Sequence, residues 1–207
     1  LLVGSINNIE LNKINFHRIK DIKVLGLGSE KNFILLQELK KLNLDSVFFI
    51  SDRDIKKVIN SNSLVEKYEI FKKYPSSLHI NIDKTKFLAR ISENGKIFYI
   101  GSNGKLSVEN YHNDYQPFIF GKPNINEFLQ FKKIFDTSKF LYEEVKNLYF
   151  FPSKRWDLEL KNDIVVKLPK NNIKNSLDLV SKLLINKNIK DVKIIDVRIK
   201  NQIILNE

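Results

Sequence analysis

The chain has 207 residues, of which 43% are hydrophobic and 11% aromatic, and this composition fits one large or two small globular domains with a buried core. It contains no cysteine, which excludes a disulfide scaffold, a cysteine nucleophile and a thiolate metal site. The net charge is +11, but 30 of the 35 basic residues are lysines spread along the chain, a distribution that does not favour a nucleic-acid binder.

The first region, residues 16–86, predicts the order strand, helix, helix, strand, strand. Imperfect alternation at 16–26 favours a strand that ends at Gly26, and apolar residues spaced by three and four predict helices at 29–42 and 52–61. Two alternating runs, 66–75 and 78–83, then predict an antiparallel hairpin. Residues 1–15 are polar with scattered Ile and Leu and are interpreted as a separate segment.

The second region, residues 87–207, predicts mostly hairpins with two helices. Asn-Gly turns at 94–95 and 103–104 separate short apolar strands. The spacings of apolar residues predict one helix at 124–136 and another that begins after Asn172. Further strands are predicted at 145–151, 155–160, 164–168 and 191–199, with a final one at 202–206 that pairs back. The fold class predicted for the whole chain is therefore α+β.

The residues with catalytic chemistry form no recognisable constellation. His17, His79 and His112 lack a second histidine at metal-ligand spacing. Asp52 and Asp54 fall at a predicted helix start, where acidic side chains stabilise the helix dipole. The stretch "GLGSEK" (26–31) lacks the spacing of a nucleotide-binding loop. The sequence predicts no enzyme activity, no metal, no cofactor and no small-molecule substrate.

The end of the chain offers a different kind of site. Trp156 alternates with Leu158 and Leu160 on one side of a predicted strand, and we interpret it as a core residue. The last strand has no successor in the chain, so it is a candidate for an open sheet edge. Such an edge can bind an extended segment of another protein by adding it as a further strand.

These segments resemble the FtsQ/DivIB family of bacterial cell-division proteins. Three stretches of the first region are similar to a POTRA domain: 19–27, 46–59 and 72–82. The second region resembles the family in "FYIGSNGKL" (98–106), "KRWDLELKNDIVVKLP" (154–169) and "IIDVRIKNQIIL" (194–205). The chain departs from the family pattern at three positions: Asp163 replaces the usual glycine, Val197 a leucine, and Leu64 a frequent tryptophan.

The resemblance implies a POTRA domain at 16–86 and an FtsQ-type β domain at 87–207, preceded by a membrane-proximal segment at 1–15. It implies a non-enzymatic scaffold of the divisome at the septum, anchored in the inner membrane by one upstream span and exposed to the periplasm. Its partners would be the division proteins FtsB and FtsL, with FtsB adding a strand to the last strand of the β domain. Trp156 would support this surface, and the partner-binding residues would be Arg198, Ile199, Asn201, Ile203 and Leu205.

Other interpretations stay open at this point. A POTRA-bearing membrane-protein assembly or translocation factor is the alternative function, although residues 87–207 carry neither a barrel pattern nor further POTRA repeats. Contact of Lys13, Arg18 and Lys20 with anionic lipid is also compatible with the sequence.

Overall fold

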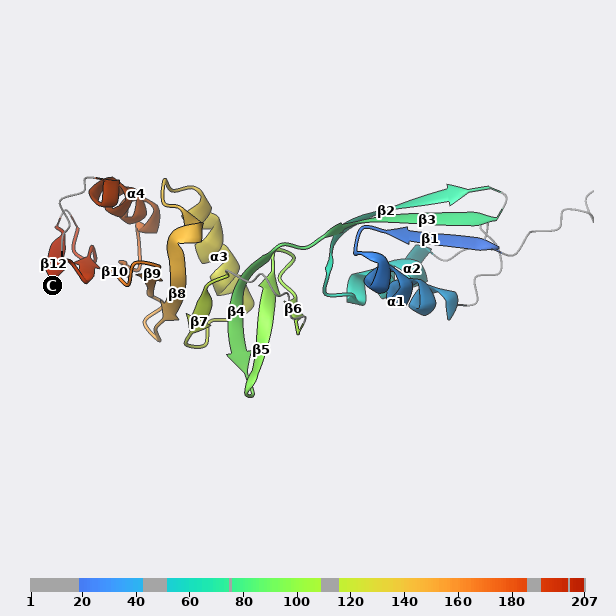
Figure 1. Cartoon of the computed structure of the whole chain (residues 1–207), viewed down its shortest axis with the longest axis horizontal. Coiled ribbons are helices and arrows are strands. Elements are labelled where there is room, and N and C mark those ends of the chain that lie inside the picture. The colour runs from blue at the N-terminus through green and yellow to red at the C-terminus, as the bar shows by residue number, and fades with distance from the viewer. Residues whose placement is uncertain are drawn as a thin grey trace, which may run out of the picture. The chain divides into compact units, whose positions relative to one another are not determined.

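The computed structural model of the chain describes residues 19–42, 52–74, 76–108, 116–185, 191–200 and 202–206. The chain divides into two compact units, residues 1–85 (unit 1) and 86–207 (unit 2), each with its own core (Figure 1). The predicted segment 1–15 and residues 46–51 of the POTRA-like stretch lie outside the described residues.

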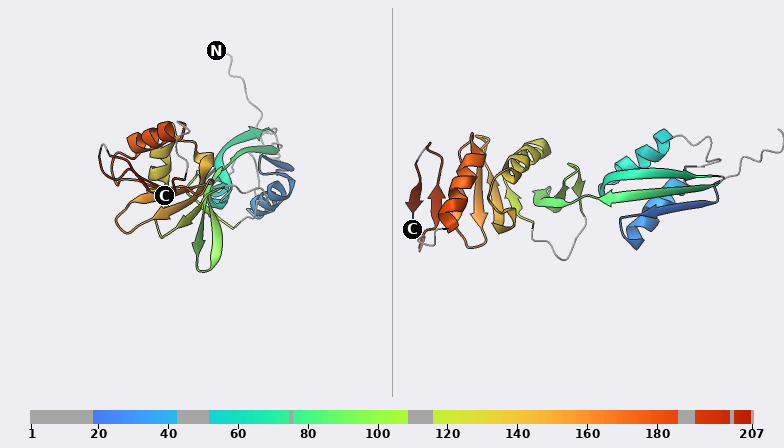
Figure 2. Two further views of the ribbon diagram at one scale, coloured as in Figure 1. Left: turned by 60° about the vertical axis from the view of Figure 1, so that its left-hand side comes forward. Right: turned by 90° about the horizontal axis from the view of Figure 1, so that it is seen from above.

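Unit 1 consists of a three-stranded sheet and two helices, in the predicted order strand, helix, helix, strand, strand (Figure 2). Its elements are β1 (Asp21–Leu25), α1 (Ser29–Lys40), α2 (Asp52–Ser61), β2 (Val65–Lys73) and β3 (Ser77–Lys84). The strand order is β1-β3-β2, with β1 parallel and β2 antiparallel to β3. The buried residues of β3 alternate with half-buried or exposed ones, so one face of the sheet packs against the helices.

Gly26 ends β1 for a steric reason. Its φ is +114°, and a Cβ at this position would lie 1.8 Å from the carbonyl oxygen of Ile82 in β3. Only glycine combines that backbone conformation with such a close approach. The chain can therefore turn from β1 into α1 directly against the neighbouring strand.

Unit 2 contains a nine-stranded sheet with α3 (Ile125–Asp136) and α4 (Ile173–Ile185) packed on it (Figure 1). The strand order is β12-β11-β10-β9-β8-β7-β4-β5-β6. A short 3₁₀ helix, η2 (Tyr142–Glu144), precedes β8. The strands are β4 (Phe87–Glu93), β5 (Lys96–Gly101), β6 (Leu106–Ser107), β7 (Phe118–Phe120), β8 (Val145–Phe150), β9 (Trp156–Leu160), β10 (Val165–Lys167), β11 (Ile194–Asp196) and β12 (Ile204–Asn206).

The sheet of unit 2 is mixed, and among the described residues five of its eight strand pairs are antiparallel. The parallel pairs are β4–β7, β7–β8 and β10–β11. Parallel neighbours need a crossover connection, and α4 supplies it between β10 and β11. The predicted α+β class is confirmed, with more parallel pairing than the predicted hairpins suggest.

The two helices of unit 2 bury the faces that their apolar spacings predict. Phe128, Phe131 and Phe135 of α3 are at most 2% exposed. At the start of α3 the Asn124 side chain accepts the backbone N–H of Glu127 at 2.8 Å, and the Glu127 carboxylate accepts the N–H of Asn124 at 3.0 Å. This capping box contributes about 1 kcal/mol to helix stability. It fixes where α3 begins on the sheet.

Candidate functional site

The hairpin formed by β9 and β10 leads toward the last strands of unit 2. Its turn is a three-residue loop, in which the N–H of Asp163 donates to the carbonyl of Leu160 at 3.0 Å and the N–H of Leu160 donates to the carbonyl of Ile164 at 2.9 Å. Asp163 has a φ of 63°, whereas Lys161 and Asn162 do not have positive φ. A type I′ turn is therefore absent from this hairpin. Asp163 adopts the left-handed conformation, at the position where the family pattern has glycine.

Trp156 attaches this hairpin to α3. Its side chain is 4% exposed, and its ring stacks on Phe131 of α3 with a centroid separation of 4.6 Å and contacts Phe150 of β8 at 4.7 Å. The interpretation of Trp156 as a core residue is confirmed. It lies on β9, so β10 and β11 separate it from β12.

Asp196 and Arg198 end β11 three residues earlier than predicted. The Asp196 carboxylate accepts the backbone N–H of Arg198 at 3.1 Å and the Arg198 guanidinium Nε at 2.9 Å. An aspartate that binds the backbone two residues onward favours a turn over a continuing strand. The prediction of a strand through Ile199 is therefore wrong. The guanidinium also lowers the pKa of Asp196.

Three charged residues and one isoleucine form a row across the face of the sheet opposite the helices. Lys167 of β10 lies between Asp157 of β9 and Asp196 of β11, and Ile204 of β12 continues the row. Burial raises the pKa of Asp157, while its hydrogen bond with Arg155 lowers it. Sequence reasoning missed Lys167 and Ile204 because only the strand register brings them together.

The backbone of β12 has one free side. Within the described residues its only neighbour is β11, so β12 ends the strand order. On β11, the carbonyl of Lys193 and the N–H of Val197 form hydrogen bonds with β10. The backbone groups of a strand point to its two neighbours at alternate residues. The N–H and C=O groups of Ile194 and Asp196 therefore point toward β12. Their partners on β12 are Asn206 and Ile204. The N–H and C=O of Leu205 consequently point away from β11.

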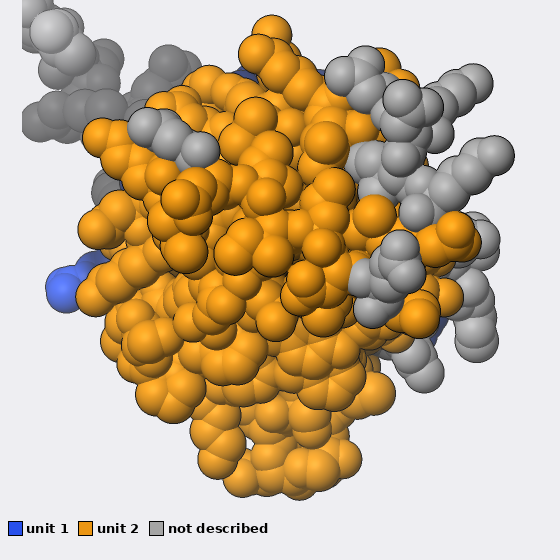
Figure 3. Space-filling model, turned by 90° about the vertical axis from the view of Figure 1, so that its left-hand side faces the viewer, with its two compact units in different colours: residues 1–85 blue, residues 86–207 orange. Residues whose placement is uncertain are grey.

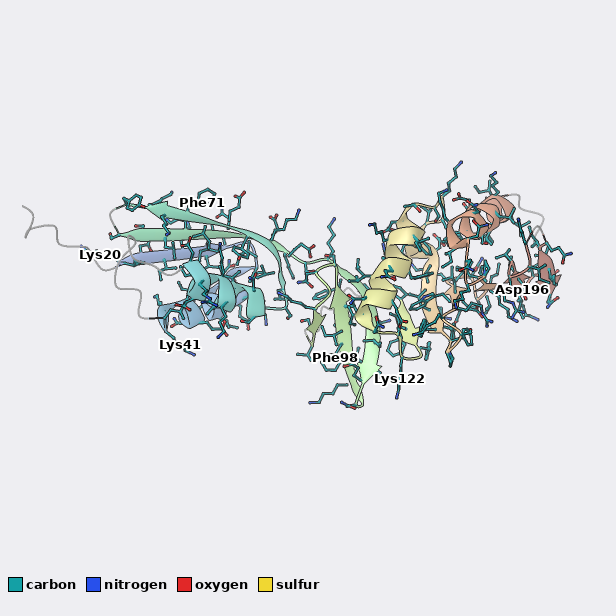
Figure 4. The ribbon with its side chains drawn as sticks, turned by 180° about the vertical axis from the view of Figure 1, so that it is seen from behind. Lys20, Lys41, Phe71, Phe98, Lys122 and Asp196 are labelled. Carbon is teal, nitrogen blue, oxygen red and sulfur yellow. The ribbon has the colours of Figure 1, made fainter. Side chains whose placement is uncertain are left out.

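The structure places the predicted partner-binding residues in different settings (Figure 3 faces the end of unit 2 that bears α4 and β12). Leu205 is 44% and Ile199 54% exposed, whereas Ile203 is half-buried and packs on the core. Arg198 is exposed but bound to Asp196, which Figure 4 labels. Asn201 lies outside the described residues. Ile204, which the sequence analysis left out, is 42% exposed on the charged face.

A hollow of about 900 Å³ adjoins the connection between β11 and β12. Its lining includes Arg198, Ile199 and Gln202 from this connection, and Asn175 and Leu179 from α4. The predicted partner residues Arg198 and Ile199 thus line a concave surface beside the sheet edge.

The described parts of the chain hold no group of three or more His, Asp or Glu side chains arranged for a metal ion. Nor does any helix in those parts have the length and apolar character needed to cross a bilayer.

Two family models match the chain. The model for the FtsQ-type POTRA domain matches residues 17–84, and the model for the C-terminal part of cell-division protein FtsQ/DivIB matches residues 81–198, more than half of the chain. The chain belongs to the FtsQ/DivIB family. The resemblance seen in the hairpin at 154–169 is therefore confirmed, and the protein is a cell-division protein with a POTRA domain.

Three relatives named cell division protein FtsQ have low sequence identity to the chain. The protein from Bradyrhizobium diazoefficiens is 21% identical over 164 residues, which are 77% of this chain and 48% of its own length. The one from Rhizobium meliloti is 20% identical over 188 residues, 89% of this chain and 61% of its own. The one from Rickettsia bellii is 21% identical over 202 residues, 89% of this chain and 70% of its own. The chain thus spans about half of the length of the first of these relatives and less than two thirds of the second.

A solved structure with similarity is the major extracytoplasmic domain of the trans isomer of the cell-division protein DivIB from Geobacillus stearothermophilus. Its TM-score is 0.36 at 11% identity, and the match covers 51% of this chain and 98% of that one. A similarity at this level adds nothing to the family assignment.

Proposed function

We propose that this protein is a non-enzymatic scaffold of the division complex that recruits the FtsB/FtsL pair in the periplasm. FtsB would add a strand to β12, with Arg198, Ile199, Asn201, Ile203 and Leu205 in the contact. The observation that carries the proposal is the position of β12 at the end of the strand order, with the backbone of Leu205 directed away from β11. No cofactor takes part in this role.

Backbone pairing alone would bind the partner weakly. In the proposed complex Ile203 and Leu205 would each pair one N–H and one C=O with the partner strand, and each hydrogen bond contributes about 1 kcal/mol net. Four such bonds correspond to a Kd of about 1 mM. Useful affinity therefore needs apolar contacts, which the exposed side chains of Ile199, Ile204 and Leu205 can supply.

Arg198 would contribute specificity more than affinity. Its guanidinium already binds Asp196, so a carboxylate of the partner would share or displace that contact. An exchange of one ion pair for another at a partly exposed position gains little free energy. It would instead select a partner with an acidic residue at the matching position.

The proposed location is the inner membrane, with one span upstream of the chain and residues 1–15 next to the bilayer. The names of the relatives and the match to the FtsQ/DivIB model support it. A POTRA unit by itself also fits an assembly or translocation factor. The match at 81–198 favours the division scaffold over that alternative.

The proposal is tested by calorimetry with a synthetic peptide from the C-terminal half of FtsB of the same organism. Leu205→Pro removes an N–H that points away from β11, whereas Leu205→Ala keeps that N–H and shortens the side chain. We expect the proline variant to lower the affinity by roughly tenfold or more, and the alanine variant by less. Ile203→Pro and Ile203→Ala form a second pair, in which both variants also lose contacts to the core.

Circular dichroism checks that each variant is folded. Equal affinity of the wild type and Leu205→Pro would contradict docking on β12. Absence of binding by the wild type would contradict recruitment of FtsB itself, without affecting the family assignment.

A further inference from the structure

One end of unit 1 gathers basic and aromatic side chains. The N–H of Lys20, just before β1, donates to the carbonyl of Ser76 at 2.9 Å, which places the start of β1 beside the turn between β2 and β3. Lys73 pairs with Ser77 at the same turn. We call this region the hairpin end and define it by Lys20, Lys40, Lys41, Phe71, Lys72, Lys73 and Tyr74.

The first helix returns to the hairpin end. β1 runs away from it, and α1 follows after Gly26 and runs back along the sheet, so its last residues Lys40 and Lys41 lie toward the end at which β1 starts (Figure 1). Figure 4 shows Lys20, Lys41 and Phe71 toward the same end of the unit. Three separate elements or their flanks, β1, α1 and β2, thus contribute to one end of the unit.

Two large aromatic side chains project from this surface. Phe71 is 44% and Tyr74 61% exposed, and lysines 72 and 73 lie between them in the chain. Single exposed apolar residues are common on soluble proteins. A surface that combines exposed aromatic rings with lysines can place the rings at the headgroup level and the lysines on anionic lipid.

The charge of the hairpin end is positive after its acidic residues are taken into account. Lys72 forms an ion pair with Asp52 at 2.9 Å, so these two charges offset each other. Asp21 lies next to Lys20 at the start of β1, and the exposed Glu38 lies in the last turn of α1. Against these two carboxylates stand four lysines, Lys20, Lys40, Lys41 and Lys73, which leaves an excess of cations for an anionic surface.

We propose that the hairpin end binds an anionic lipid surface, with Phe71 and Tyr74 in the headgroup layer and the lysines on lipid phosphates. The residues that precede Lys20 join unit 1 at this end, so a membrane span upstream would bring the surface to the bilayer. In this respect the inference uses the proposed location. It is independent of FtsB binding, which concerns unit 2.

Flotation with lipid vesicles tests the proposal. The wild-type chain is mixed with vesicles of 30% phosphatidylglycerol in phosphatidylcholine, or of phosphatidylcholine alone. Each lysine near an anionic surface contributes about a fivefold gain in partitioning. We expect binding to the anionic vesicles only, and a loss of at least about 25-fold in the double variant Lys20→Glu, Lys73→Glu.

The matched control is Lys96→Glu, Lys122→Glu, which changes the net charge by the same amount at exposed lysines of unit 2. This control should partition within about threefold of the wild type. An equal loss in both double variants would mean general attraction of a basic protein and would overturn the proposal. Failure of the wild type to bind anionic vesicles would overturn it as well.

Insertion of the aromatic side chains is tested separately with Tyr74→Trp. Because Trp156 is buried, a change in emission on adding vesicles would report the new indole. We expect a shift to shorter wavelength with anionic vesicles. A variant that binds the vesicles without such a shift would overturn the placement of Tyr74 in the headgroup layer. Calorimetry with the FtsB peptide would be unaffected by either result, so failure of this inference is distinguishable from failure of the proposed function.

Discussion

The indole of Trp156 joins three elements of unit 2, because it contacts Phe131 and Phe128 of α3 and Phe150 of β8 from its own position on β9. The neighbours of Trp156 are also large aromatic rings. They cannot move together to fill the space that a smaller side chain at this position would leave. The contribution of Trp156 is therefore to the stability of the sheet that presents β12, at a distance from the edge itself.

Trp156→Ala should lower the free energy of unfolding of unit 2 by about 3–5 kcal/mol, since it removes a buried aromatic ring and leaves a cavity. Trp156→Phe should cost less, because a ring remains in the stack. Urea unfolding followed by circular dichroism measures both changes in free energy. Tryptophan fluorescence is unsuitable as the probe, because both substitutions remove the chain's one tryptophan. A loss below about 1 kcal/mol in the alanine variant would contradict the assigned packing role.

Glu159 is the centre of a polar cluster on the face of the sheet opposite the helices. Its carboxylate accepts the Tyr149 hydroxyl at 2.6 Å and the Asn147 amide at 2.9 Å, and Lys146 lies 3.0 Å away. These contacts hold its pKa at about 2, with the hydrogen bond from Tyr149 as the largest cause. The folded state therefore binds a proton on Glu159 more weakly than the unfolded state does.

This difference predicts a pH dependence of stability. The contribution of Glu159 is fully present above about pH 4.5 and is lost as the pH falls toward 2. Urea unfolding at several pH values should give a gap between the wild type and Glu159→Gln that is large at pH 7 and closes near pH 2. Burial raises the pKa of Asp157, so its contribution to stability changes with pH in the opposite direction. This contribution is present in both the wild type and Glu159→Gln and therefore cancels from the difference between them. A gap independent of pH would contradict the assignment.

At the scale of elements, periodicity and turn residues predicted most of what is local. The spacing of apolar residues at 124–136 predicts the buried face of α3, and the Asn-Gly sequence at 94–95 predicts the turn between β4 and β5. The return of the last strand onto β11 was also predicted. These features depend on neighbours in the chain, which a single sequence contains.

Long-range pairing was not predictable in this way. The sequence patterns predict no element at residues 116–123, yet Phe118–Phe120 forms β7 and lies between β4 and β8, parallel to both. Its three residues are too few for a periodic pattern. The row of Asp157, Lys167, Asp196 and Ile204 likewise exists only through the register of four strands. The direction of the Leu205 backbone, on which the candidate site depends, follows from the same register.

At the scale of the whole molecule, the chain separates its two proposed contacts. The proposed FtsB contact on β12 belongs to unit 2, and the hairpin end belongs to unit 1. Each unit has a core of its own. A chain of residues 86–207 should therefore unfold cooperatively and bind the FtsB peptide with a Kd within about threefold of the full chain. Circular dichroism and calorimetry check the two parts of this prediction. Loss of binding by a folded unit 2 would mean that unit 1 contributes to the site.

Amide hydrogen exchange of β12, followed by NMR with and without the FtsB peptide, shows whether the partner adds a strand to this edge. In the free protein, the N–H of Leu205 should exchange faster than those of Ile204 and Asn206, which face β11. Addition of the peptide should slow exchange at Leu205 by at least about tenfold and change Ile204 much less. If the peptide binds and Leu205 exchanges as fast as before, the partner does not add a strand to this edge.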